Sequence, residues 1–208
     1  MRLTRLFACL AAFAGLASCA SLPTAAPPAA TDSREAFVIA ANPLAAQAGL
    51  DVLKRGGSAI DAAVAVQAML SLVEPQSSGL GGGAFLNHYD AASRKVSIYD
   101  GREVAPAQAS ATMFLDSAGR PLPFGEAVVS GRATGVPGVV RMLAQAHGEH
   151  GRLPWASLFG AAERTAEQGF IVSPRLQRMI HGSFPQNKAP DVVAYFSRPD
   201  GTRLKAGD

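Results

Sequence analysis

The stretch QSSGLGGGAFLNHYDAASRKVSIYDGRE, residues 76–103, decides how this chain folds. It begins with a glycine run, continues through two short apolar segments joined by DAASR, and ends just beyond Arg102. Glycine has no Cβ, so the run within 79–83 indicates a loop whose backbone comes close to a neighbouring group. The two apolar segments, 84–89 and 95–99, predict a β-hairpin, because a short polar turn separates two runs of strand-forming residues.

Two helices are expected before the glycine run. Asn42 is a favoured N-cap residue and the proline after it suits a first helical turn, so one helix is predicted from 43 to 55. Ser58 and Asp61 form a weaker variant of the capping box, which predicts the start of a second helix. Because residues 62–73 are nearly all apolar, this second helix is expected to be buried at the centre of the fold.

The remaining elements are predicted from shorter signals. The apolar run 37–40 is interpreted as a buried strand. Residues 116–125, which are rich in glycine and proline, are expected to form a surface loop. Further helical segments are predicted at 139–147, 155–168 and 174–181.

The first 18 residues are typical of a bacterial lipoprotein signal peptide. Arg2 and Arg5 supply its positive charge, and an apolar segment follows that is too short to span a membrane. The sequence LASC, residues 16–19, resembles a lipobox, in which Cys19 becomes the lipid-carrying N-terminus. An ordinary secretory signal is the alternative. Residues 19–36 are rich in proline and alanine, which favours an extended tether, and the folded part is expected at 37–208.

This leader fixes the expected location and the thiol chemistry. The protein is predicted to be periplasmic and lipid-anchored to a bacterial membrane, with the outer membrane favoured, or to be secreted to the periplasm if Cys19 is not lipidated. Cys9 leaves with the leader, so no thiol remains for a disulfide, a metal site or a nucleophile. The net charge of +3 falls to +1 without Arg2 and Arg5. The sequence contains no basic patch, so nucleic acid is not expected as a partner.

Three familiar kinds of site do not fit the sequence. Residues 79–84 match a dinucleotide-binding fingerprint, but they follow a helix and precede a strand, whereas that motif needs the reverse order. The histidines lack metal-site spacing, and His147–His150 is interpreted as the solvated end of a helix. No Gly-x-Ser-x-Gly motif marks a nucleophilic serine. Neither a metal nor a cofactor is expected.

Arg102 is the strongest candidate for contact with a ligand. It follows the second predicted strand, close in sequence to the glycine run, and its planar guanidinium suits a carboxylate. The residues alone also allow a plain structural role, in which Arg102 pairs with Asp100, Glu103 or another nearby acid.

Seven motifs in order resemble the γ-glutamyltransferases, and together they cover most of residues 38–180. They are PLAAQAG at 43–49, LKRGGSAIDAAVA at 53–65, GLGGG at 79–83, DGREVAP at 100–106, ATMF at 111–114, GVPG at 135–138 and HGRLPW at 150–155. So many motifs in one order are far more specific than any single glycine run.

This resemblance implies an α+β chain of the N-terminal nucleophile hydrolase type, an αββα sandwich that is incomplete here. In the family, a precursor cuts itself into two subunits, and the new N-terminal threonine attacks the γ-glutamyl amide of glutathione, with its own α-amine as base. The acyl group then passes to water or an amino acid. The family's carboxylate-binding arginine falls on Arg102.

One departure from the family pattern limits what this chain is expected to do. The family's nucleophile opens a Thr-Thr-His motif, which this sequence lacks. No catalytic residue is therefore expected here, and the chain is interpreted as an inactive fragment of the large subunit. Its expected partners are γ-glutamyl compounds, the rest of the large subunit and the small subunit. A lipid-anchored amino-acid or carboxylate-binding module and a β-lactam acylase relative are the alternatives.

Overall fold

A computed structural model describes residues 36–208 and shows both of the helices expected before the glycine run. Helix α2 spans Pro43–Lys54, and the Asn42 side chain accepts a hydrogen bond from the Leu44 amide at 3.0 Å. Helix α3 spans Ala59–Val73, and Ser58 and Asp61 form a complete capping box at its start. The predictions for both helices are confirmed. Both could be made from the sequence because capping depends on residues close together in the chain.

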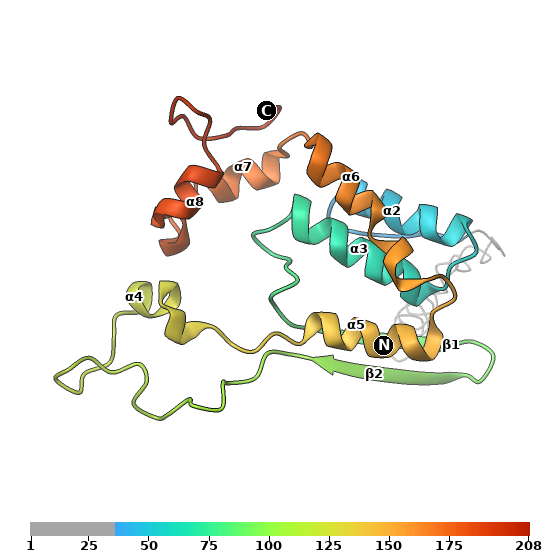
Figure 1. The fold of residues 1–208 in the computed structure, drawn as a ribbon, viewed down its shortest axis with the longest axis horizontal. Coiled ribbons are helices and arrows are strands. Elements are labelled where there is room, and N and C mark those ends of the chain that lie inside the picture. The colour runs from blue at the N-terminus through green and yellow to red at the C-terminus, as the bar shows by residue number, and fades with distance from the viewer. Residues whose placement is uncertain (1–35) are drawn as a thin grey trace, which may run out of the picture. The chain divides into compact units, whose positions relative to one another are not determined.

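Helix α3 lies at the centre of the described structure, as its apolar composition predicts. Helices α2 and α6 lie beside it, and α5, which spans Val139–His150, contacts it from the side of the hairpin (Figure 1). Helix α6 spans Gly160–Gln168 and follows the 3₁₀ helix η2, Trp155–Leu158. The main core cluster consists of Val52, Ile60, Ala62, Val64, Ala65, Tyr99, Val139, Met142, Leu143, Ala146 and Leu158.

The predicted hairpin is present as an antiparallel pair. Strand β1 spans Ala84–Asp90 and strand β2 spans Lys95–Gly101, with Ala84 opposite Gly101 and Asp90 opposite Lys95. One face packs on α5 and carries Leu86 and the buried Tyr99. The other face is open and exposes four apolar side chains, Phe85, Tyr89, Val96 and Ile98, by 60–70%.

The rest of the described chain forms short helices and loops. Helix α7 confirms the amphipathic segment expected near 174–181, whereas α4 and α8 had no clear sequence signal. The expected loop at 116–125 ends where α4 begins. These elements are α4 at Phe124–Val129, η1 at Gly131–Ala133, α7 at Pro174–Ile180, η3 at Pro185–Lys188 and α8 at Pro190–Tyr195.

The strand predicted at 37–40 is wrong. These residues have no strand conformation, and Phe37 and Ile39 are 78% and 86% exposed. Val38 instead packs against Gly49 of α2, where an added Cβ would lie 3.1 Å from a Val38 methyl group. Residues 37–40 are apolar, but they pack through Val38 on the surface of a helix and do not pair with a strand.

The signal peptide, the lipidation site Cys19 and almost all of the tether lie outside the described residues. Between Ala36 and Asp208, no helix combines the length and the hydropathy that a membrane span requires.

Candidate functional site

A polar cleft of about 480 Å³ opens along the glycine run. We call residues Gln76–Gly83 the glycine loop and this cavity the loop cleft. Its wall is built mostly from backbone and from small or polar side chains. The lining residues are Gln67, Pro75, Gln76, Ser77, Ser78, Gly79, Gly82, Gly83, Ala84 and Glu103.

The end of the glycine loop is pressed against the end of strand β2. A Cβ added to Gly83 would lie 2.6 Å from Glu103 Oε2 and 2.8 Å from Arg102 Cα, closer than real Cβ atoms approach. The Gly82 carbonyl accepts hydrogen bonds from the amides of Gly138 and Val139, each at 3.2 Å. The close approach predicted for the glycine run is therefore present, and its neighbour is the segment that carries Arg102.

Arg102 does not itself line the loop cleft, but it pairs with Glu103, which does, and it is only loosely held. Its side chain is 58% exposed, and Nη1 is 3.5 Å from Glu103 Oε2. Ion pairs this exposed stabilise a protein by at most about 1 kcal/mol, so the guanidinium remains available to a ligand. Asp100 accepts a hydrogen bond from the Arg102 backbone amide at 2.9 Å and does not bind its side chain.

Glu103 is the residue of this site that sequence reasoning treated only as a partner for Arg102. Its Oε2 atom is buried against the glycine loop without a hydrogen-bond donor in the described structure. A buried carboxylate oxygen without a hydrogen-bond donor is costly, and the ion-pair partner of this oxygen is Arg102 Nη1 at 3.5 Å. Its position directly after Arg102 was the one available sequence signal.

The start of the glycine loop is anchored by a buried acid, Glu74. Its carboxylate accepts hydrogen bonds from Asn42 Nδ2 at 3.1 Å, from Gln76 Nε2 and from Arg175 Nη1. Burial alone would raise the pKa of Glu74, but these donors outweigh burial and lower it. Sequence reasoning missed Glu74 and Arg175, because they meet across 101 residues without a local pattern.

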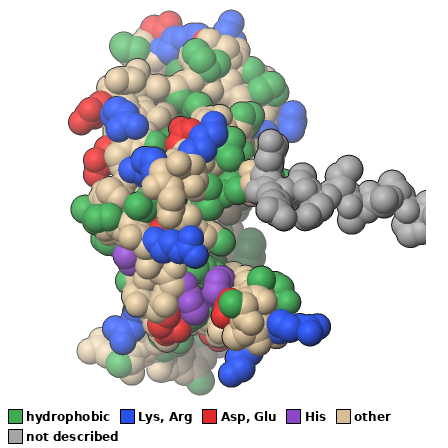
Figure 2. Space-filling model, turned by 90° about the vertical axis from the view of Figure 1, so that its right-hand side faces the viewer, with side chains coloured by type: hydrophobic (Ala, Val, Ile, Leu, Met, Phe, Trp, Pro, Cys, Tyr) green, Lys and Arg blue, Asp and Glu red, His purple; other side chains and the backbone are tan. Residues whose placement is uncertain are grey.

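The histidines lie in the last turn of α5, as predicted, but their side chains are half-buried and not solvated. His147 Nε2 lies 2.9 Å from the Leu153 carbonyl and 3.4 Å from Asp61 Oδ1. His150 Nε2 lies 2.8 Å from the Tyr99 hydroxyl. A third ring, that of His88, stacks on His150 with centroids 4.1 Å apart, and Figure 2 shows histidines gathered on one face.

The Tyr99 hydroxyl also donates a hydrogen bond to Glu149 Oε2 at 2.6 Å. This bond raises the pKa of Tyr99 above its ordinary value. In the described part of the chain, no three His, Cys, Asp or Glu side chains are arranged to bind a metal ion.

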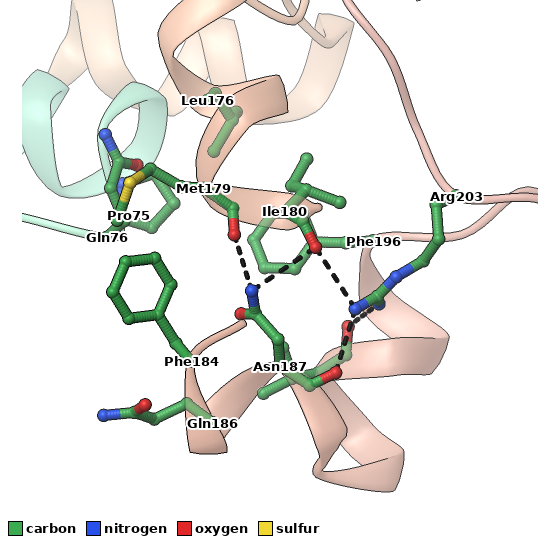
Figure 3. A pocket seen from close by; sticks show the side chains of 11 residues that line it. Pro75, Gln76, Leu176, Met179, Ile180, Phe184, Gln186, Asn187, Phe196 and Arg203 are labelled. Carbon is green, nitrogen blue, oxygen red and sulfur yellow. Dashed lines mark hydrogen bonds between the residues drawn. The ribbon is translucent and has the colours of Figure 1, made fainter. Parts of the chain in front are cut away.

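A second cavity, of about 450 Å³, lies between α7, η3 and α8 and is mainly apolar (Figure 3). Its polar side chains are occupied with backbone carbonyls: Asn187 Nδ2 bonds those of Met179 and Gly182, and Arg203 bonds those of Ile180 and Asn187. Pro75 and Gln76 line both cavities, so the two lie back to back.

Comparison with known proteins identifies the fold and the family. The family model described as Gamma-glutamyltranspeptidase matches residues 45–208. The chain is 41% identical over 178 residues to the glutathione hydrolase proenzyme of Bacillus subtilis (strain 168), a match that covers 84% of this chain. The chain belongs to the γ-glutamyltransferase family. It spans about 30% of the length of that relative.

Solved structures of γ-glutamyltransferases and their relatives agree with this family. The Helicobacter pylori γ-glutamyltranspeptidase superposes with a TM-score of 0.75 at 31% identity, covering 83% of this chain and 49% of that one. A cephalosporin acylase from Bacillus halodurans gives 0.64 at 29% identity, over 90% of this chain and 36% of that one. The expected fold class, an α+β chain of the N-terminal nucleophile hydrolase type, is confirmed.

Proposed function

We propose that the complete gene product is a γ-glutamyltransferase or glutathione hydrolase, and that Arg102 binds the α-carboxylate of its γ-glutamyl donor. The observation that supports this proposal is the exposed guanidinium of Arg102, which is paired at 3.5 Å with Glu103, a residue that lines the loop cleft. A guanidinium and a carboxylate form two parallel charge-assisted hydrogen bonds, which fix the orientation of the donor.

The residues present supply the binding half of such a site. In the proposed reaction, a threonine hydroxyl attacks the γ-glutamyl amide carbon, the amine leaves with a proton, and water or an amino acid then releases the acyl group. The threonines of this sequence include no Thr-Thr-His motif. We therefore infer that residues 1–208 do not catalyse the reaction alone and that the small subunit of the complete product contributes the nucleophile.

Replacing Arg102 tests the proposed function. In the complete product, Arg102→Ala should weaken donor binding by at least about 2 kcal/mol, a roughly 30-fold rise in KM, because a charged partner is lost. Steady-state hydrolysis of γ-glutamyl-p-nitroanilide measures the change. Lys95→Ala, which removes a positive charge at the other end of strand β2, is the matched control. An unchanged donor KM in Arg102→Ala would remove this residue from the site.

The similarity to a cephalosporin acylase supports a second candidate donor, a β-lactam side-chain amide. Both donors have an acyl carbon that a threonine can attack, so the two activities differ in specificity more than in mechanism. Relative kcat/KM values for glutathione and for a glutaryl cephalosporin decide between them. If the complete product hydrolyses neither compound, the alternative of a non-catalytic carboxylate-binding module is favoured.

The lipid anchor at Cys19 and the periplasmic location also remain proposals, since they fall on residues outside those described. They are supported by the LASC sequence directly after the apolar part of the leader. Incorporation of labelled palmitate that disappears in Cys19→Ser would support the anchor, whereas a soluble periplasmic product without the label would contradict it.

A further inference from the structure

The glycine loop is attached to the rest of the protein at its two ends and is free in the middle. At Gly81, no atom lies within 4 Å of the position that a Cβ would take. At the far end, Gly82 binds the first amides of α5 and Gly83 packs on Arg102. The attachment at the near end therefore decides how the loop is placed.

That near attachment centres on Glu74, which is 1% exposed and forms the C-cap of α3. Its backbone carbonyl accepts hydrogen bonds from the amides of Ser77 and Ser78, each at 3.0 Å. The Ser78 hydroxyl accepts a further bond from Gln67 of α3 at 2.9 Å. These contacts form the first turn of the loop directly on the end of α3.

Arg175 is the contact to this turn that comes from a distant part of the chain. It lies in the first turn of α7, and its Nη1 atom donates to the Glu74 carboxylate and, at 3.2 Å, to the Ser77 hydroxyl. The same nitrogen thus binds both the buried anchor and the loop itself. The Arg175 side chain is 45% exposed and that of Glu74 is 2% exposed. This ion pair therefore joins the partly exposed start of α7 to the buried end of α3.

We propose that Arg175 is a positioning residue for the donor site, which fixes the near end of the glycine loop and thereby the wall of the loop cleft beside Arg102. This inference rests on the proposed function. Three of the ten residues that line the loop cleft are Gly79, Gly82 and Gly83. Glycine backbone is conformationally permissive, so the geometry of this part of the wall depends on the contacts at the two ends of the loop.

The test compares variants of the complete gene product. Arg175→Ala removes both contacts, Ser77→Ala removes only the contact to the loop, and Arg175→Lys keeps a positive charge with N–H donors at this position. Arg178→Ala, on an exposed position of the same helix, is the matched control. Donor KM and kcat are measured well below the melting temperature, together with the Kd of L-glutamate by calorimetry.

We expect Arg175→Ala to raise the donor KM and the glutamate Kd by about 3- to 30-fold, with a smaller change in kcat. Ser77→Ala should show part of this loss although the Glu74–Arg175 pair stays intact, Arg175→Lys should recover most of it, and Arg178→Ala should match the wild type. If Arg175→Ala lowers only the melting temperature, and KM and Kd stay unchanged in both Arg175→Ala and Ser77→Ala, the positioning role is overturned. An inactive wild-type product that also fails to bind glutamate would instead overturn the proposed function, and this inference with it.

Discussion

Gly83 occupies a position where no side chain fits. An added Cβ would lie 2.6 Å from Glu103 Oε2, 2.7 Å from the Gly101 carbonyl oxygen and 2.8 Å from Arg102 Cα. Two of these three atoms belong to the backbone, so the strand end that carries Arg102 would have to move. The glycine is therefore required by space and not by an unusual backbone angle.

Gly83→Ala should accordingly destabilise the protein by about 2 kcal/mol or more through overpacking, and should raise the donor KM because Arg102 is displaced. Thermal unfolding and donor kinetics of the complete product measure the two effects. Gly81→Ala is the matched control, since nothing lies within 4 Å of its added methyl group. Equal melting temperatures for the two variants would contradict the packing described for Gly83.

At the scale of elements, Asp61 joins the start of α3 to the turn that follows α5. The carboxylate is fully buried and accepts hydrogen bonds from the amides of Ser58, Arg152 and Leu153. Burial would raise the pKa of Asp61, but these bonds outweigh burial and lower it. A carboxyl group whose pKa is lowered by folding contributes its full stabilisation at any pH above its pKa in the unfolded protein. This contribution is lost as the pH falls through its pKa in the folded protein.

The stability of the wild type should therefore fall with pH below about 4, the unfolded pKa of aspartate. Asp61→Asn should lower the free energy of unfolding by at least about 2 kcal/mol at pH 7 and flatten this acid dependence, because one linked proton is removed. Urea unfolding between pH 2 and 7 measures both. An Asp61→Asn profile parallel to that of the wild type would show that Asp61 does not contribute to the acid dependence.

Elements with complete local signals were predictable from the sequence. Asn42 and Ser58 identify the starts of α2 and α3 because capping is decided within four residues. The strand prediction at 37–40 was wrong because hydrophobicity alone does not show whether an apolar segment pairs with a strand or packs on a helix. The short helices α4 and α8 depend on surroundings that a local pattern does not contain.

The site divides in the same way. The close approach of the glycine loop was predictable, because a glycine run shows in a few residues, whereas the role of Arg102 as a ligand-binding residue stays a prediction. The Glu74–Arg175 pair and the contact of Asp61 with the turn at 152–153 form between segments more than 90 residues apart. Only the folded chain brings such partners together.

At the scale of the whole molecule, the open face of the hairpin brings four exposed apolar side chains together on one surface. Phe85, Tyr89, Val96 and Ile98 project from one side of a two-stranded sheet, and such a sheet is marginally stable without cover. We propose that in the complete product a second sheet covers this face, since the matched region makes up only 30% of the Bacillus subtilis relative.

Ile98→Lys tests that proposal, because a lysine is tolerated on an open face and costly under a second sheet. In the complete product we expect a loss of about 2 kcal/mol or more, seen as a lower melting temperature and lower soluble yield. Ala92→Lys, in the exposed hairpin turn, is the control. A stable and soluble Ile98→Lys protein would mean that this face stays open to solvent.

The Gly82 carbonyl accepts hydrogen bonds from the amides of Gly138 and Val139, so these two amides can report on the position of the glycine loop. An amide exchanges its hydrogen with solvent only when its hydrogen bond opens, so these two protons record how often the loop leaves its place. Their exchange should slow when a donor occupies the cleft and quicken when the near anchor is cut. Two protons at the start of a helix thus make the motion of a glycine-rich loop measurable by deuterium uptake.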